Sequence, residues 1–216
     1  FHVNWGEGFR ANSSVGRLDQ VFGPETGHGY EAGAKLVLPG VRAAITWFGV
    51  SKHNLLASDP IDPNFLAAVG SVTSHGIELD GEIELSRGLR LVGNYALTDA
   101  EASDPAFPTS AVLNVPRHAG TLQLFAAIPA AGRPLDLSIG ATYVGPRSGA
   151  LDGGNLRLDG YVKAKASASY ALTDALIARV EIDNLFDATY AMNSYSALWI
   201  YPGAPRSVMA SLTVRY

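Results

Sequence analysis

The chain has 216 residues, of which 47% are hydrophobic, with 23 glycines, 12 prolines, no cysteine and a formal net charge of −4. The small negative charge excludes a nucleic-acid-binding surface, and the lack of cysteine excludes disulfides and thiolate metal sites. No apolar run reaches the roughly 18 residues that a membrane-spanning helix needs. The opening FHVNWGEGF has neither an initiator methionine nor a signal peptide, so we expect the chain to be part of a longer one.

Apolar and polar residues alternate along most of the chain. The pattern is clearest in GIELDGEIEL, where Ile77, Leu79 and Ile83 share one face and Glu78 and Glu82 share the other. Strict alternation predicts β-strands with one apolar and one polar face. We predict about ten strands and no helix. In chain order, the segments are residues 1–9, 30–38, 41–52, 76–85, 89–99, 117–127, 135–145, 161–172, 176–184 and 207–216.

Long and short connections alternate between these segments, which predicts an antiparallel up-and-down meander with its tight turns at one end. Strands of about ten residues, with aromatic residues near their ends, favour a transmembrane barrel over a soluble β-sandwich. In the sandwich, the apolar faces of two sheets would pack together. The long connections are 10–29, 52–73, 100–116, 146–160 and 184–206, and the short ones are 39–40, 86–88, 128–134 and 172–175. The aromatic residues expected to form the interfacial girdles are Trp47, Tyr95, Tyr143, Tyr161, Tyr170 and Tyr216.

The C-terminal segments NLFDATY and YPGAPRSVMASLTVRY resemble the C-terminal signature of TonB-dependent outer-membrane receptors. GEGFRANS, FGPETGHGYEAGAKL, SHGIELDGEIEL, LNVPRHAGTL and ATYVGPRSG are similar to further elements of that family, especially of its ferric-siderophore receptors, and occur in the expected order. In the resemblance, 176–184 is the penultimate strand and 207–216 the closing strand. The signature residues are Asn184, Leu185, Phe186, Asp187, Tyr190, Gly203, Pro205, Arg206 and Tyr216.

The resemblance implies an all-β fold, a transmembrane antiparallel barrel of which residues 1–216 form the C-terminal part. By this resemblance we expect about ten strands of a 22-stranded barrel in residues 1–216, with the plug domain and the N-terminal strands absent from them. The implied function is energy-coupled uptake of ferric siderophores across the outer membrane of a Gram-negative bacterium, without enzymatic activity. The implied partners are outer-membrane lipid, the ferric siderophore, the TonB energy-coupling protein through the missing N-terminal region, and the barrel-assembly machinery through the C-terminal strand.

The long connections hold the candidate ligand residues. Aromatic rings and guanidinium groups suit an anionic iron chelate because they supply stacking and charge-assisted hydrogen bonds. For Trp199 and Tyr201, membership of the outer aromatic girdle is an equally good interpretation. The candidates are Arg10, Arg147, Tyr195, Trp199 and Tyr201.

Other readings remain open at this point. The charged residues of the alternating strands are expected to line a hydrated interior. The five histidines are scattered without metal-ligand spacing, so we expect no bound metal. The alternatives to siderophore uptake are uptake of cobalamin or of a carbohydrate on the same scaffold, a soluble β-sandwich binding module, and a passive porin.

Overall fold

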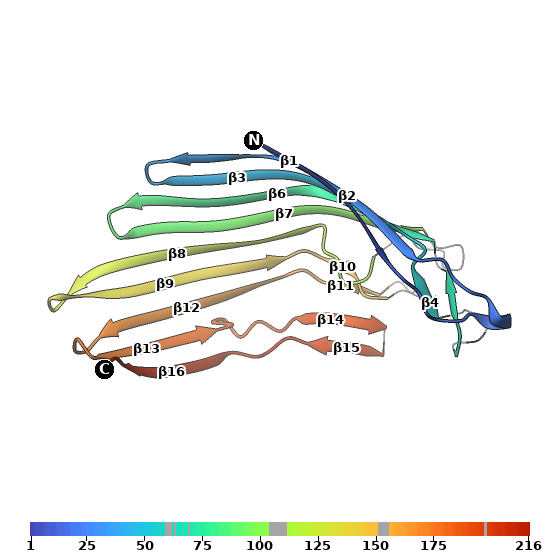
Figure 1. The fold of residues 1–216 in the computed structure, drawn as a ribbon. Helices are drawn as coiled ribbons and strands as arrows, with labels where there is room; N and C mark the ends of the chain where they lie inside the picture. Colours follow the sequence, from blue (N-terminus) through green and yellow to red (C-terminus); the bar gives the residue numbers. More distant parts are fainter. Residues whose placement is uncertain (59–61, 63, 69, 104–111, 151–155, 197) are drawn as a thin grey trace.

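Ten long strands form one antiparallel sheet in the computed structural model, which describes residues 1–58, 62, 64–68, 70–103, 112–150, 156–196 and 198–216. Their order is β1-β2-β3-β6-β7-β8-β9-β12-β13-β16, so each long strand pairs with the next one along the chain (Figure 1). The predicted meander is therefore confirmed. The strands are β1 His2–Arg10, β2 Glu25–Leu38, β3 Val41–His53, β6 Ser71–Ser86, β7 Leu89–Ser103, β8 His118–Ala130, β9 Arg133–Val144, β12 Tyr161–Ala171, β13 Leu176–Asp183 and β16 Ser207–Val214.

The only helical segment in the described residues is a 3₁₀ turn, Arg17–Asp19. No helix there is long and apolar enough to cross a membrane.

The two ends of the sheet differ as the connection lengths predict. Tight turns gather at one end, called the turn end here, where Gly88 and Gly132 adopt φ values of +80° and +81° that glycine tolerates without strain. The long connections leave from the opposite end, called the loop end (Figure 1). There the structure adds six short strands that alternation did not predict, in three two-stranded sheets. They are β4 Leu56–Ser58, β5 Leu66–Ala68, β10 Arg147–Ser148, β11 Arg157–Leu158, β14 Ala191–Ser196 and β15 Trp199–Pro202.

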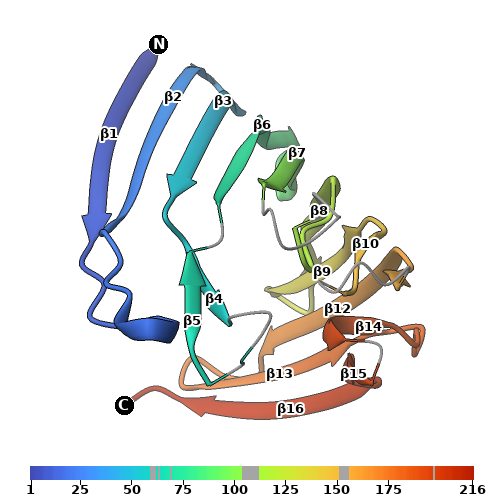
Figure 2. The same cartoon turned by 90° about the vertical axis from the view of Figure 1, so that its right-hand side faces the viewer.

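The strand register separates an apolar from a polar face. Ile77 lies opposite Trp47 on one side and Leu97 on the other, whereas Glu82 lies opposite Arg42 and Val92. Directly opposed residues share a face in an antiparallel pair, so the apolar rows continue across the sheet. Viewed along the strands, the sheet curves into a trough whose edges, β1 and β16, stay apart (Figure 2).

No second layer formed by the described residues covers the apolar face of the sheet. Among the described residues, the buried hydrophobic side chains are only Phe22, Ala150, Leu158 and Ala164, whereas Ile77, Leu79 and many others are exposed. A soluble sandwich buries its apolar faces against each other. That alternative is therefore wrong, and the sheet has the form of a barrel wall.

The girdle prediction needs two corrections. Val162, not Tyr161, lies opposite Tyr143, so Tyr161 belongs to the polar face of the sheet. Trp47 and Tyr95 lie in the middle of their strands, not near the ends. Strands β2, β3, β6 and β7 continue toward the loop end beyond these rings, and their apolar face becomes polar there, with His28, His53 and His75. The strands therefore extend beyond the apolar band. Alternation assigns each residue to a face but does not show how far along a strand the apolar band reaches.

Candidate functional site

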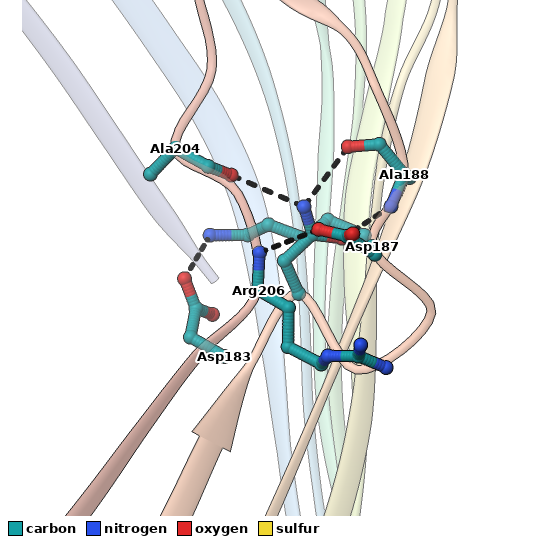
Figure 3. Close-up of polar contacts among 7 residues, drawn as sticks. Asp183, Asp187, Ala188, Ala204 and Arg206 are labelled. Atoms are coloured by element: carbon teal, nitrogen blue, oxygen red, sulfur yellow. Dashed lines mark hydrogen bonds and ion pairs between the residues drawn. The ribbon is translucent and has the colours of Figure 1, made fainter.

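A buried asparagine organises the end of β13. Asn184 adopts a left-handed φ of +49°, and its side chain is completely buried. Its Nδ2 donates to the Ala188 carbonyl at 2.9 Å and to the Ala204 carbonyl at 3.1 Å, while its Oδ1 accepts from the Ala188 amide at 2.9 Å. Figure 3 shows Ala188 and Ala204 approaching this group from opposite ends of the last connection. One amide side chain thus joins the start and the finish of the β13–β16 connection.

Asp187 repeats this connection three residues later. It also has a positive φ of +53°, and its Oδ1 accepts from the Arg206 amide at 2.8 Å (Figure 3). Asparagine and aspartate tolerate this backbone region better than other residues with a Cβ, which explains their place in the signature.

Tyr190 fills the space between the two ends. Its ring stacks on Tyr161 of β12 with 4.2 Å between centroids, and its carbonyl accepts from the Gly203 amide at 2.8 Å. The ring lies directly against Gly203, so that a methyl group at position 203 would overlap it. Asn184, Asp187, Tyr190, Gly203 and the backbone of Arg206 therefore form one cluster, called the signature cluster here. Leu185 is tied to β12 by a backbone hydrogen bond to Ala164, whereas Phe186, Pro205 and Tyr216 are exposed.

The signature cluster supports the hairpin of β14 and β15, which carries three of the five candidate ligand residues. Trp199 and Tyr201 are 61% and 49% exposed. They lie two residues apart on β15, so they project from the same face of the hairpin. Tyr195 lies on β14, but its side chain is outside what the structure describes. The structure thus brings Trp199 and Tyr201 together, and their contact with a ligand stays a prediction.

Arg147 lies behind this hairpin instead of on an open surface. Arg147 is only 5% exposed, and its Nη2 donates to the carbonyls of Ala191 and Met192 at 2.7 and 2.8 Å. The guanidinium also lies 5.7 Å from the centre of the Tyr161 ring. These contacts account for a structural role, and its predicted ligand contact has no support in this geometry.

Arg10 lies far along the sheet from the hairpin, on the edge strand β1. Its exposed guanidinium pairs with Glu25 at 2.7 Å, and Lys52 lies 3.8 Å from the same carboxylate. The sheet therefore does not place Arg10 beside Trp199.

The polar face of the sheet carries ion pairs, as expected for a hydrated interior. Glu82 pairs with Arg90 at 3.2 Å, and Lys163 pairs with Asp183 at 2.9 Å directly below the signature cluster (Figure 3). In the ranges that the structure describes, no three His, Asp or Glu side chains form a group able to hold a metal ion.

Sequence reasoning missed Asn114 and Ser194. The Asn114 side chain donates from Nδ2 to the Ser194 carbonyl at 2.7 Å and accepts from the Ser194 amide at 3.0 Å. The two residues are 80 positions apart, and no local pattern signals their contact.

Comparison with known proteins now adds the family. The protein-family model described as "TonB dependent receptor-like, beta-barrel" matches residues 1–185. The metal-pseudopaline receptor CntO of Pseudomonas aeruginosa is 34% identical over 99% of this chain and 31% of its own length. The ferrichrome outer membrane transporter/phage receptor of Escherichia coli is 29% identical over 100% of this chain and 30% of its own. The chain thus spans about a third of the length of these relatives.

Solved structures agree on the fold. The siderophore receptor PiuA from Acinetobacter baumannii superposes with a TM-score of 0.82 at 20% identity, over 99% of this chain and 33% of that one. The ferric yersiniabactin uptake receptor FyuA from Yersinia pestis gives 0.78 at 21%, over 98% and 34%. At these identities, the likeness establishes a shared barrel-wall architecture.

Proposed function

Because the chain belongs to the TonB-dependent receptor-like β-barrel family, we propose that it forms the C-terminal wall of an outer-membrane receptor for energy-coupled uptake of ferric siderophores. The observation that carries this proposal is the relationship over nearly the whole chain to receptors named for siderophores and metal chelates. A plug domain, N-terminal strands and the TonB energy-coupling protein complete the proposed machinery. The closing strand, β16, is the proposed contact of the barrel-assembly machinery. The chain itself performs no chemical reaction in this proposal.

The two faces of the sheet suit two different environments, lipid on one side and water on the other. The apolar rows, such as Trp47, Ile77 and Leu97, suit contact with outer-membrane lipid, since charged side chains are costly there. The opposite face, with Glu82 and Arg90, suits a water-filled path. Trp199 and Tyr201 at the loop end would meet the chelate first.

One observation favours a second substrate. The relative with 34% identity is named for metal-pseudopaline, not for a ferric siderophore alone. A receptor for a metal chelate of that kind would use the same wall, the same energy coupling and the same hairpin. Iron is therefore the first metal to test, and other transition metals are the second.

The experiment uses the full-length protein in an iron-starved host that lacks its own receptors, with and without the TonB protein. Uptake is followed for ⁵⁵Fe-ferrichrome, ⁵⁵Fe-ferrioxamine B, ⁵⁵Fe-pyoverdine and metal–pseudopaline complexes. We expect TonB-dependent uptake of at least one ferric siderophore. Uptake of none, with the protein folded in the outer membrane, would refute the siderophore proposal and leave the barrel intact.

A further inference from the structure

Strand β14 has one edge that no strand among the described residues covers. It pairs with β15 alone, in a sheet separate from the wall. The Tyr190 carbonyl accepts from Gly203 on the β15 side, so the next carbonyl, that of Ala191, points away from β15 because successive carbonyls alternate in direction. A strand edge of this kind presents unpaired backbone groups that need partners.

Two side chains supply those partners. Arg147 Nη2 donates to the carbonyls of Ala191 and Met192. Met192 is the extra residue of a bulge between the Ala191–Pro202 and Asn193–Tyr201 pairs, which explains how two consecutive carbonyls reach one nitrogen.

Asn114 covers the next part of the edge. Its amide engages both the carbonyl and the amide of Ser194, as the peptide group of a neighbouring strand would. Ser194 is itself buried, and its Oγ donates to the Gly149 carbonyl at 2.6 Å. The free edge is therefore paired by side chains from two other connections.

Arg147 and Asn114 are themselves held in place. Arg147 belongs to β10, which pairs with β11, and lies over the Tyr161 ring. The backbone N–H of Asn114 donates to the Ser148 carbonyl at 3.0 Å. The β7–β8, β9–β12 and β13–β16 connections thus meet at one joint. Burial of a cation is costly without such hydrogen bonds, so the guanidinium is constrained to this position.

From this joint we infer that Arg147 and Asn114 are positioning residues, which hold the β14–β15 hairpin in the orientation that presents Trp199 and Tyr201 to the ligand. The link to a ligand rests on the proposed function, whereas the positioning of the hairpin does not. A preformed surface binds more tightly because less order is lost on binding. If loss of Arg147 leaves the hairpin correctly oriented in a tenth of the molecules, the apparent affinity falls about tenfold.

The first experiment measures hairpin order without any ligand. In the full-length receptor, Leu198→Cys on the hairpin and Leu172→Cys at the turn end, both exposed, carry spin labels for a pulsed-EPR distance distribution. We expect one narrow distribution in the parent and in Arg157→Met, a matched control at an exposed arginine of the same connection. Arg147→Met should broaden it, Asn114→Ala should broaden it less, and Arg147→Lys should restore most of the order, since the ammonium still donates to carbonyls.

Each outcome decides the inference. A distribution as narrow in Arg147→Met as in the parent would overturn it. Loss of heat-modifiable migration on a gel would show that Arg147→Met does not fold, and Asn114→Ala then decides in the same way.

Uptake provides the second readout. We expect Arg147→Met to raise the half-saturating concentration of ⁵⁵Fe-ferrichrome, or of the other complex of the panel that is transported, about tenfold while Arg157→Met does not. An unchanged value with a disordered hairpin would overturn the link to the ligand. Absence of uptake by the parent would refute the proposed function alone, because the distance distributions still test the positioning.

Discussion

Replacing Asn184 with alanine should open the last connection locally. The change removes three part-buried hydrogen bonds, those of the Asn184 side chain with the Ala188 amide and with the carbonyls of Ala188 and Ala204. Each lost hydrogen bond costs about 1 kcal/mol, and alanine at a φ of +49° adds about 1 kcal/mol. The expected loss is therefore about 4 kcal/mol. Since every 1.4 kcal/mol is a factor of ten, the opening equilibrium should rise about a thousandfold.

Hydrogen exchange of the peptide 184–190 in the full-length receptor measures this opening directly. Asn184→Gly should recover about fivefold relative to Asn184→Ala, because glycine adopts the left-handed backbone freely and avoids the strain of about 1 kcal/mol. Asn54→Ala is the matched control, since Asn54 also has a positive φ of +58° but is exposed, with one hydrogen bond to the Pro24 carbonyl. It should leave the exchange of 184–190 unchanged. An increase of less than about tenfold in Asn184→Ala would refute the assignment of the three hydrogen bonds as the tie between the two ends.

Three further predictions concern the cluster, the wall and the hairpin. Gly203→Ala should destabilise the receptor by about 1–3 kcal/mol, because the added methyl group overlaps the Tyr190 ring, and should lower the fraction with heat-modifiable migration on a gel. A second change, Tyr190→Ala, should recover part of the lost stability. Leu124→Lys on the apolar face should destabilise the protein by about 2–4 kcal/mol in urea unfolding from lipid vesicles, whereas Gln123→Lys on the polar face should not; equal costs would contradict the assignment of faces. Trp199→Ala should raise the half-saturating concentration for uptake about tenfold without changing the receptor level, and an unchanged value would place Trp199 in the aromatic girdle.

The wall was predictable because one local rule determines most of it. Alternation assigned Ile77 and Glu78 to opposite faces, and the short turns at Gly88 and Gly132 set which strands pair. Depth along the strand was not predictable in the same way. Trp47 lies in mid-strand because β3 runs on beyond the apolar band, and alternation assigns the face of a residue without fixing where along the strand that band ends.

The joint at the loop end was much less predictable. Asn184 and Asp187 were recognised as part of a signature, but their left-handed backbone and their partners at positions 204 and 206 are visible only in three dimensions. Arg147 shows the limit most clearly. An arginine in a long connection is usually exposed, yet this one is buried and donates its hydrogen bonds to carbonyls 44 and 45 residues away. Contacts at such separations leave no period in the sequence.

The way in which the hairpin is held has a consequence for specificity. Arg147 and Asn114 bind only backbone atoms of β14, at Ala191, Met192 and Ser194. Since every residue type offers the same carbonyl, most side chains of the hairpin can change without loss of these hydrogen bonds. A strand ladder to the wall would hold the hairpin equally well, but it would also fix the hairpin in the curvature of the sheet. Attachment through two side chains separates the orientation of the hairpin from the side chains that it displays, so that under the proposed function residues such as Trp199 can change to suit different chelates on the same wall.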